Sequence, residues 1–291
     1  MYPSTFEYHR PDSVAEAIDL VVEHADAEVE LLAGGHSLLP TMKSGLASPD
    51  VVVDIGGLDD LRGIEPNGDA TTVGALTPYA DVVDHDGLWE AATVVAEAAG
   101  EIGDIQVRNR GTVGGNIAHN DPASDLPAAV LAADATVHAS GRGGERTIPA
   151  DDFFVGMYAT ALEPDELVTG IEVPHQADGA GGAYVKKPSP ASGYAMVGVA
   201  AVVEAEDGEI TGARVAANGA LDHATRLGPV EDALVGEPLD PDVAEAAGKH
   251  ATDDVEDWQL MDDIHASAEF RGHLLEVYAG RAIARAIERA E

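Results

Sequence analysis

The sequence predicts an α+β fold in two parts, and three observations support this prediction. Short apolar runs typical of strands alternate with amphipathic helical runs in the N-terminal half. The stretch PHQADGAGGA, residues 174–183, is rich in Gly, Ala and polar residues, as linkers are. Beyond it, a long hairpin pattern is followed by helical segments. We therefore expect a domain over residues 1–176, built of α/β subdomains 1–56 and 57–176, and a domain over 177–291 with a three-stranded antiparallel sheet and helices.

The helices of the N-terminal part are predicted from caps and from the period of apolar residues. Ser13 and Glu16 have the spacing of a capping box, and apolar residues follow at helical period, which predicts a helix over 13–24. Thr77-Pro78 is a good cap and first-turn pair, and LWEAATVVAEAAG predicts a helix that ends at Gly100. The other elements expected here are strands over 29–32, 50–56, 135–139 and 166–173, a hairpin over 61–76 that turns at Asn67-Gly68-Asp69, and a helix over 125–133.

The rest of the chain is predicted as one long loop, one hairpin and three helical segments. Residues 101–124 are rich in Gly and Asn and poorly periodic, and a loop of that length within a compact domain is usually functional. The hairpin turns at Asp207-Gly208. The helical segments cover residues 228–236, 241–250 and 261–290.

The charge balance excludes two classes of partner. The chain has 53 acidic and 16 basic residues, a formal net charge of −37, and acidic pairs such as Asp59-Asp60 recur along its length. A dispersed acidic surface repels nucleic acid and anionic membranes, so we predict neither as a partner. Because salt screens the self-repulsion of such a surface, we expect a halophilic, salt-adapted protein.

Missing residue types and patterns limit the chemistry further. The absence of cysteine excludes disulfides and thiolate-held zinc or iron–sulfur clusters within this chain. No apolar stretch reaches the roughly 18 residues that span a bilayer, and the start lacks a secretory signal pattern, so we expect a cytoplasmic protein without membrane insertion. His119, Asp121 and Asp125 lack metal-ligand spacing, and no nucleophile–base triad stands out. No metal site and no catalytic residue are predicted.

The first glycine-rich loop follows a predicted strand. Residues 31–40 read LLAGGHSLLP, so an apolar pair runs directly into two glycines, a histidine and a serine. Glycines let a ligand oxygen approach consecutive backbone N–H groups, which together form an anion nest. Taken alone, most such glycine pairs are plain turns.

A second glycine pair favours a phosphate site. Residues 111–116 read Gly-Thr-Val-Gly-Gly-Asn. Two such loops could clasp a diphosphate, with Ser37, Thr112 and Asn116 as side-chain donors and Asp125 as an acceptor for a hydroxyl or amine. Neither loop has the spacing GxGxxG or GxxxxGK(S/T), which disfavours the classical dinucleotide and Walker folds.

The motifs AGGHSLLP, TVGGN and SDLPA resemble those of the FAD-binding medium subunits of molybdenum hydroxylases, the family of carbon monoxide dehydrogenase and xanthine dehydrogenase. The resemblance runs from FEYHRPDS near the start to the last helix. It implies an FAD-binding domain of the PCMH, or vanillyl-alcohol-oxidase-like, type, followed by a small α+β domain. It also implies that FAD is held noncovalently, although His36 could by its chemistry alone be a covalent attachment point.

The resemblance implies that both glycine loops wrap the FAD diphosphate. The loop residues concerned are Leu32, Ala33, Gly34, Gly35, His36, Ser37, Leu38, Thr112, Val113, Gly114, Gly115 and Asn116.

Five further flavin contacts are implied in the same way. Asp125 matches the acidic residue of the SDL motif, and Val168 falls where the backbone touches the adenine side. Ile102 and Tyr194 match residues on the two faces of the isoalloxazine ring, and Lys186 matches a lysine beside it. Because Lys186 and Tyr194 follow the linker, the flavin would lie between the two domains, a common place for ligand clefts.

The resemblance implies an electron-transfer subunit with two kinds of partner. These are a large molybdopterin-binding subunit and a small subunit with two iron–sulfur clusters, arranged as a dimer of heterotrimers, and only they would hold those cofactors. Electrons would reach this flavin from the iron–sulfur subunit and leave to NAD+, a quinone or another acceptor. Two alternatives stay open: a stand-alone flavin oxidase or reductase of the related fold, and a nonenzymatic nucleotide-binding module.

Overall fold

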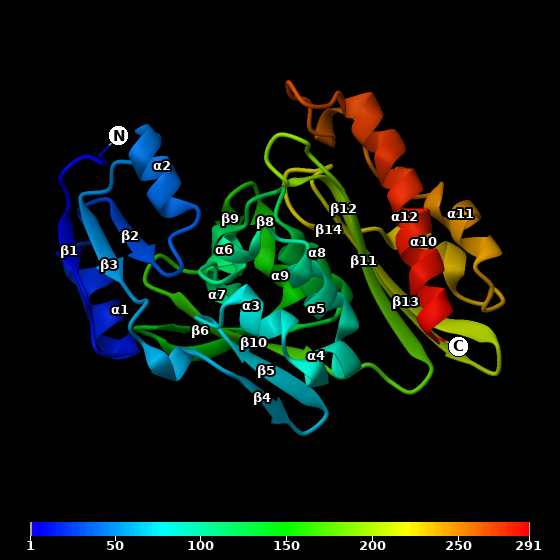
Figure 1. The fold of residues 1–291 in the computed structure, drawn as a ribbon, viewed down its shortest axis with the longest axis horizontal. Helices are drawn as coiled ribbons and strands as arrows, with labels where there is room; N and C mark the ends of the chain where they lie inside the picture. Colours follow the sequence, from blue (N-terminus) through cyan, green and yellow to red (C-terminus); the bar gives the residue numbers. More distant parts are fainter. Residues whose placement is uncertain (1, 291) are drawn as a thin grey trace.

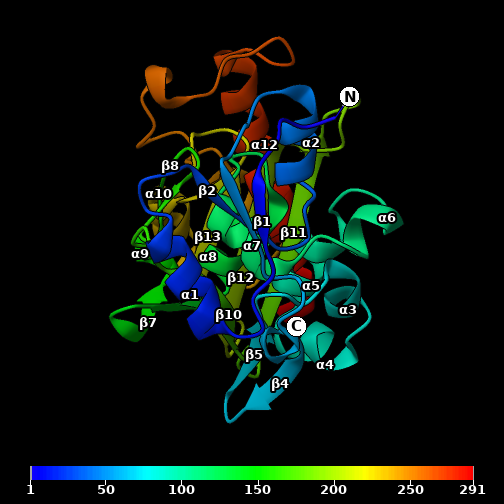
Figure 2. The same cartoon turned by 90° about the vertical axis from the view of Figure 1, so that its left-hand side faces the viewer.

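The computed structural model describes residues 2–290 and begins with a small parallel sheet (Figure 1). Its strand order is β1 (Glu7–His9), β3 (Val51–Asp54), β2 (Val29–Leu32). Figure 2 views the molecule from this side, with α2 (Leu38–Ser44) above and α1 (Val14–Glu23) below the strands. The helix expected over 13–24 is confirmed: the Ser13 hydroxyl accepts the N–H of Glu16 at 3.2 Å.

A five-stranded antiparallel sheet forms the middle of the molecule. Its order is β4 (Ile64–Asn67), β5 (Ala70–Gly74), β10 (Leu167–Pro174), β6 (Thr136–Gly141), β7 (Gly144–Pro149). The hairpin over 61–76 is confirmed, and Gly68 supplies the positive φ of +63° at its turn. Strand β7 and the short pair β8 (Phe154–Gly156) and β9 (Ala159–Thr160) are additional to the prediction.

The helices that lie between β5 and β8 in the chain differ from the prediction in three places. The helices are α3 (Tyr79–Val83), α4 (Asp86–Ala91), α5 (Thr93–Gly100), α6 (Ile105–Arg108), α7 (Val113–His119), α8 (Asp125–Ala132) and α9 (Ala150–Phe153). The single helix expected to end at Gly100 is two helices, α4 and α5. Residues 101–124 are not one loop, because they contain α6 and α7. Pro78 rather than Thr77 caps α3, since the Thr77 hydroxyl donates to the Gly63 carbonyl at 3.0 Å.

The C-terminal sheet has one strand more than expected. Its order is β11 (Ala180–Pro188), β12 (Ala195–Glu206), β13 (Glu209–Asn218), β14 (Thr225–Arg226). The hairpin turn at Asp207-Gly208 is confirmed, with positive φ at both residues. Since β11 begins at Ala180, the linker is shorter than 174–183.

Three α-helices follow this sheet. They are α10 (Gly228–Leu234), α11 (Asp242–Gly248) and α12 (Ala268–Ala290). The last helix therefore starts later than the expected residue 261. Short 3-10 turns occupy Asp59–Leu61 and Asp257–Gln259.

The C-terminal sheet is buried on both faces, which ties the two parts of the chain together. On one face α10, α11 and α12 pack around Leu275 and Ile283. On the other face α5 and α8 pack against β11, β12 and β13, so that Tyr184 and Ala200 join the core of the preceding domain (Figure 1). Every residue of α8 is buried. Within residues 2–290, no helix combines the length and apolar character needed to cross a membrane.

Candidate functional site

The two glycine loops touch, and the contact requires glycine. The first loop leaves β2 and enters α2, whereas the second loop forms the start of α7. A Cβ added to Gly34 would overlap the main-chain oxygen of Arg110 and lie 2.9 Å from the Cα of Gly111. A Cβ on Gly115 would lie 3.4 Å from the Cβ of Ala33. The structure therefore brings together the two segments that the sequence pairs in a clasp.

The first loop presents a run of free main-chain donors. The N–H groups of Gly34 through Leu38 have no hydrogen-bond acceptor among residues 2–290. Gly35 has a φ of +74°, a left-handed conformation that glycine adopts without strain. The Ser37 side chain forms no cap hydrogen bond with the following helix. Successive unpaired N–H groups of this kind form an anion-binding concavity.

The second loop has no such free run among the described residues, so the two loops of the clasp are not equivalent. The N–H groups of Val113 and Gly114 donate to the carbonyls of Thr77 and Ala75 at 3.0 and 2.8 Å. The Gly115 N–H donates to the Thr112 hydroxyl at 3.3 Å, which makes Thr112 the N-cap of α7. What this loop can offer a ligand is therefore side-chain donors and close packing.

Side-chain donors do remain on the second loop. The Asn116 amide nitrogen donates to the Tyr79 hydroxyl at 2.9 Å, and its oxygen accepts from the Ser124 hydroxyl at 2.7 Å. An amide nitrogen carries two hydrogens and a threonine hydroxyl one, so Asn116 and Thr112 each keep a hydrogen to donate.

A buried ion pair joins the two parts of the chain beside these loops. Lys186 Nζ lies 2.9 Å from Asp125 Oδ2, and their side chains are only 4% and 6% exposed. The ammonium also donates to the carbonyl oxygens of Glu101, at 2.6 Å, and Gly193, at 3.0 Å. Since Ile102 follows Glu101 and Tyr194 follows Gly193, one lysine fixes the backbone beside both predicted ring contacts.

Tyr184, which the sequence analysis missed, completes this network. Its hydroxyl donates to Asp125 Oδ1 at 2.5 Å and lies 3.1 Å from the Asn218 side-chain oxygen. Burial raises the pKa of Asp125 to about 6, because the lowering by Lys186 and by the Tyr184 hydrogen bond only partly offsets it. Burial and the adjacent carboxylate raise the pKa of Tyr184 well above its ordinary value, so the phenol stays protonated. Tyr184 and Lys186 are two residues apart on β11, so their side chains leave the same face of the strand. This spacing is a sequence signal that could have identified Tyr184.

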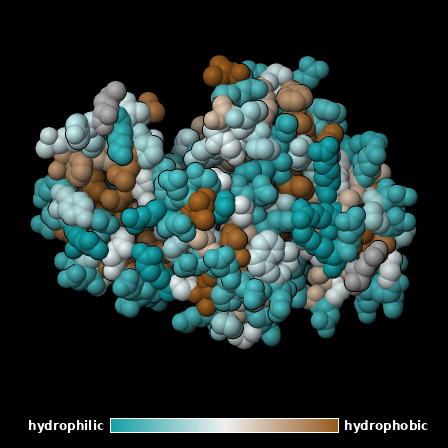
Figure 3. All heavy atoms as spheres, viewed as in Figure 1, coloured by the Kyte–Doolittle hydropathy of each residue, from teal (hydrophilic) through white to brown (hydrophobic). Residues whose placement is uncertain are grey.

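The remaining predicted residues differ in their surroundings. Tyr194 is 44% exposed, Ile102 is half-buried and His36 is exposed. Val168 is buried in β10, next to a bulge, and its neighbour Leu167 belongs to the cluster that includes Ala33. The surface in Figure 3 is indented at its upper edge, between the part that carries α2 and the part that carries the turn from β11 into β12 (compare Figure 1).

Arg108 holds the segment before the second loop in place. Its guanidinium donates to the carbonyl oxygens of Ile102, at 3.0 Å, and Gly103, at 3.2 Å. Among residues 2–290, Arg108 forms no salt bridge to an acidic side chain. Arg108 instead fixes the backbone around Ile102.

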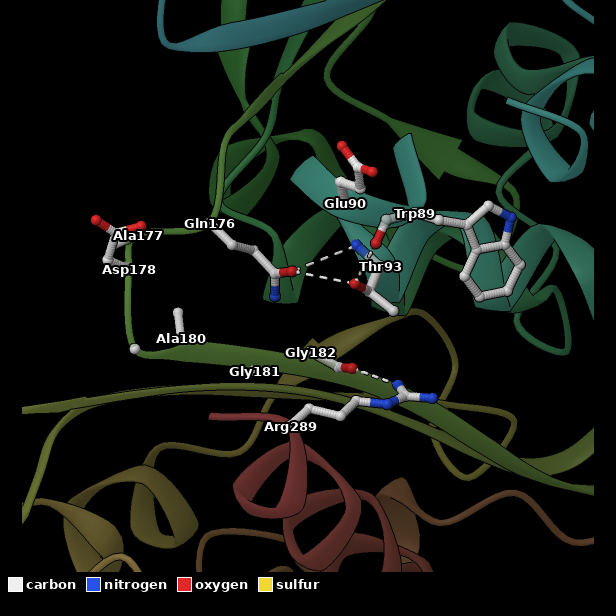
Figure 4. A pocket seen from close by; sticks show the side chains of 11 residues that line it. Trp89, Glu90, Thr93, Gln176, Ala177, Asp178, Ala180, Gly181, Gly182 and Arg289 are labelled. Carbon is white, nitrogen blue, oxygen red and sulfur yellow. Dashed lines mark hydrogen bonds between the residues drawn. The ribbon is translucent and has the colours of Figure 1, made fainter. Parts of the chain in front are cut away.

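A cavity of about 540 Å³ lies elsewhere and contains none of the predicted residues (Figure 4). The Gln176 side-chain oxygen accepts the N–H and the hydroxyl of Thr93 at 3.4 and 3.3 Å. Arg289 donates to the Gly182 carbonyl and to Glu97, which is buried on α5. Of these bonds, the one between Arg289 and Glu97 joins the two domains, and we assign this cavity no ligand. A smaller cavity of about 80 Å³ lies beside Tyr194.

Comparison with known protein families and sequences gave matches along almost the whole chain. A family model described as "FAD binding domain in molybdopterin dehydrogenase" matches residues 4–176, and one described as "CO dehydrogenase flavoprotein C-terminal domain" matches 182–286. The carbon monoxide dehydrogenase medium chain of Hydrogenophaga pseudoflava is 37% identical over 290 residues, which cover 100% of this chain and 98% of that one. The nicotine 6-hydroxylase medium subunit of Paenarthrobacter nicotinovorans is 36% identical over 279 residues, 96% of each chain.

A solved structure is similar over the same length. It is the carbon monoxide dehydrogenase from Hydrogenophaga pseudoflava, in a form that lacks the Mo-pyranopterin moiety of the molybdenum cofactor. The two chains superpose with a TM-score of 0.94 at 38% identity, and the match covers 99% of each.

Proposed function

Because the chain belongs to the family of FAD-binding medium subunits of molybdenum hydroxylases, we propose that it passes electrons from an iron–sulfur partner subunit to an external acceptor. The predicted family and fold class are confirmed. FAD is the cofactor of this family, and the molybdenum and iron–sulfur cofactors belong to other subunits. FAD supplies the redox chemistry when bound, and this chain supplies position and electrostatics.

The observation that carries the proposal is the run of unpaired N–H groups from Gly34 to Leu38. A diphosphate would accept hydrogen bonds from these groups, so that a chain with a net charge of −37 needs few basic side chains to hold it. Thr112 and Asn116 would add side-chain donors from the second loop. The residues present therefore fit the cofactor.

Asp125 and Lys186 would be the charged residues of the site, each with its own role. Asp125 would accept a hydroxyl or amine hydrogen, while the Lys186 ammonium holds the backbone that carries the ring contacts. Ile102 and Tyr194 would exclude water from the two ring faces, and Val168 would border the adenine.

We propose the partners that the family suggests: a large molybdopterin-binding subunit and a small subunit with two iron–sulfur clusters, in a dimer of heterotrimers. The absence of cysteine supports this, because this chain has no thiolate to hold an iron–sulfur cluster. A division into domains 1–176 and 177–291 accompanies the proposal. The acceptor would be NAD+, a quinone or another oxidant.

Substrate selection would then lie in the large subunit. Two relatives of nearly equal identity to this chain, 37% and 36%, are named for carbon monoxide and for nicotine. Sequence identity in the medium subunit therefore does not indicate which substrate the complex oxidises.

Purification of the untagged protein from its source, in high salt, tests the proposal. A yellow complex that contains molybdenum, iron and two further chains supports it. A yellow monomer that turns over a substrate with oxygen would support the stand-alone oxidase instead. A colourless monomer that binds no added FAD would refute both flavin functions.

A further inference from the structure

We propose that Glu7, His9 and His24 form a binding site for one divalent transition-metal ion of the zinc class, on the N-terminal sheet and apart from the glycine loops. One ligand atom from each of the three side chains lies within 4.8 Å of the other two. In the part of the chain that the structure describes, no other three His or acidic side chains meet this criterion. The site is independent of the FAD function.

The backbone holds the three ligands in fixed places. Glu7 and His9 alternate on β1, so their side chains leave the same face of the strand. Both residues are in register with β3, Glu7 opposite Val51 and His9 opposite Val53. His24 caps the C-terminus of α1, which packs on the same sheet. Only side-chain rotation is needed to bring the ligand atoms around an ion.

The side-chain geometry is close to that of a coordinated ion. His9 Nε2 lies 2.9 Å from Glu7 Oε1, and the rings of His9 and His24 are 5.1 Å apart at their centroids. Zinc–nitrogen bonds of about 2.0–2.1 Å in a tetrahedron place ligand atoms roughly 3.3 Å apart. The side chains of His9 and Glu7 are 27% and 58% exposed, which leaves them free to adjust and leaves a fourth position open to water.

The donor set decides the class of ion. Two imidazoles and one carboxylate suit Zn²⁺, Co²⁺, Ni²⁺ or Cu²⁺, whereas Mg²⁺ and Ca²⁺ prefer oxygen ligands alone. The net charge of −37 attracts all cations, so dependence on the imidazoles is what distinguishes this site from general binding to carboxylates. With no cysteine in the chain, no thiolate competes for the ion.

The experiment uses the full chain without an affinity tag, stripped with EDTA, in molar KCl with excess Mg²⁺ to occupy surface carboxylates. Titration with Co²⁺, followed by its visible absorption, and with Zn²⁺, followed by calorimetry, should give one ion per chain. His9→Ala and His24→Ala should each weaken binding by about tenfold or more. His250→Ala is the matched control, because that imidazole pairs with Asp253 at 2.7 Å and belongs to no group of three.

Thermal melting gives a second readout. Zn²⁺ should raise the melting temperature of the wild type and of His250→Ala but not that of His9→Ala or His24→Ala, since an ion that binds only the folded state stabilises it. If a histidine variant does not fold, Glu7→Gln is used in its place, because glutamine keeps the shape of the side chain. This variant should also bind the ion more weakly than the wild type. Equal Co²⁺ binding by the wild type and these variants, or equal loss in His250→Ala, would overturn the site.

Discussion

Replacement of Gly34 by alanine tests the clasp at the point where the two loops meet. The added Cβ would overlap the Arg110 oxygen and lie 2.9 Å from the Gly111 Cα. Both atoms are main-chain atoms that cannot rotate away. Because ordinary contact begins near 3.4 Å, the Gly111 Cα alone requires a shift of about 0.5 Å, the difference between 3.4 and 2.9 Å, and the closer Arg110 oxygen requires a larger one.

The expected loss follows from the hydrogen bonds that this shift disturbs. A hydrogen bond to a charged group contributes roughly 1.5–3 kcal/mol, and each 1.4 kcal/mol is a factor of ten in Kd. If the shift removes one N–H contact to the diphosphate, Gly34→Ala should weaken FAD binding by about ten- to hundredfold. Since the first loop, which must shift, is only half-buried, the free energy of unfolding should change less than the free energy of FAD binding.

The assay is titration of FAD with the full chain in high salt, read from quenching of flavin fluorescence. Gly143→Ala is the matched control, because a Cβ at that position meets nothing within 4 Å. Substitution at Gly114 is less informative, since a Cβ there would overlap Ala75 in the core and disturb the fold. Wild-type affinity in a folded Gly34→Ala protein would refute the reasoning.

Three other predictions concern the buried charges and the surface. Tyr184→Phe removes a hydrogen bond that lowers the pKa of Asp125, so this pKa should rise further above about 6, as read by carboxyl carbon NMR. The folded-state pKa of Asp125 exceeds its ordinary value of 3.8, so the contribution of this group to stability is present at low pH and is lost as the pH rises through the folded-state pKa. In Tyr184→Phe, this loss of stability should occur at a higher pH than in the wild type. An unchanged Asp125 titration would contradict the network. Glu97→Gln removes the charge that pairs with Arg285 and Arg289, and it should lower the free energy of unfolding in urea by about 1–3 kcal/mol. The loss should be smaller than for a fully buried pair because the side chains of the two arginines are 46% and 29% exposed. A wild-type urea midpoint would argue against this clamp. The melting temperature of the wild type should rise from dilute buffer to molar KCl as salt screens the charge of −37, and a flat profile would contradict salt adaptation.

Elements with strong local signals could be predicted from the sequence. Ser13 starts α1 as its cap, and Gly68 and Gly208 supply the positive φ that their hairpin turns require. Helix α7 could not be predicted, because adjacent glycines disfavour a helix. Gly114 is required at its position because it packs against Ala75 where no Cβ fits, and Thr112 caps the helix.

Other boundaries depend on contacts between distant residues. Helices α4 and α5 separate at Ala92 although no Gly or Pro marks the break. There the Gln176 N–H donates to the Ala91 carbonyl at 2.7 Å. This bond from the linker replaces the hydrogen bond that the carbonyl would accept within a continuous helix. Helix α12 starts late because the Ser267 hydroxyl accepts the N–H of Phe270 at 3.2 Å and so begins the helix.

From the sequence, the candidate site could be proposed as a set of residues but not as a division of roles among them. Motif resemblance supplied Asp125 and Lys186, and the structure joins them in one ion pair. Nothing in the two glycine pairs indicates that the N–H groups of the second loop are already bonded to Thr77 and Ala75. Those acceptor carbonyls lie in the segment that follows β5, far from the second loop in the sequence.

Hydrogen–deuterium exchange of the full chain with and without FAD tests the central claim most directly. Within the part of the chain that the structure describes, the N–H groups of Gly34 to Leu38 lack acceptors, whereas those of Val113 and Gly114 are already bonded. FAD should therefore slow exchange across residues 34–38 and leave 113–114 nearly unchanged. Protection confined to the second loop, or no protection of the first, would contradict the account.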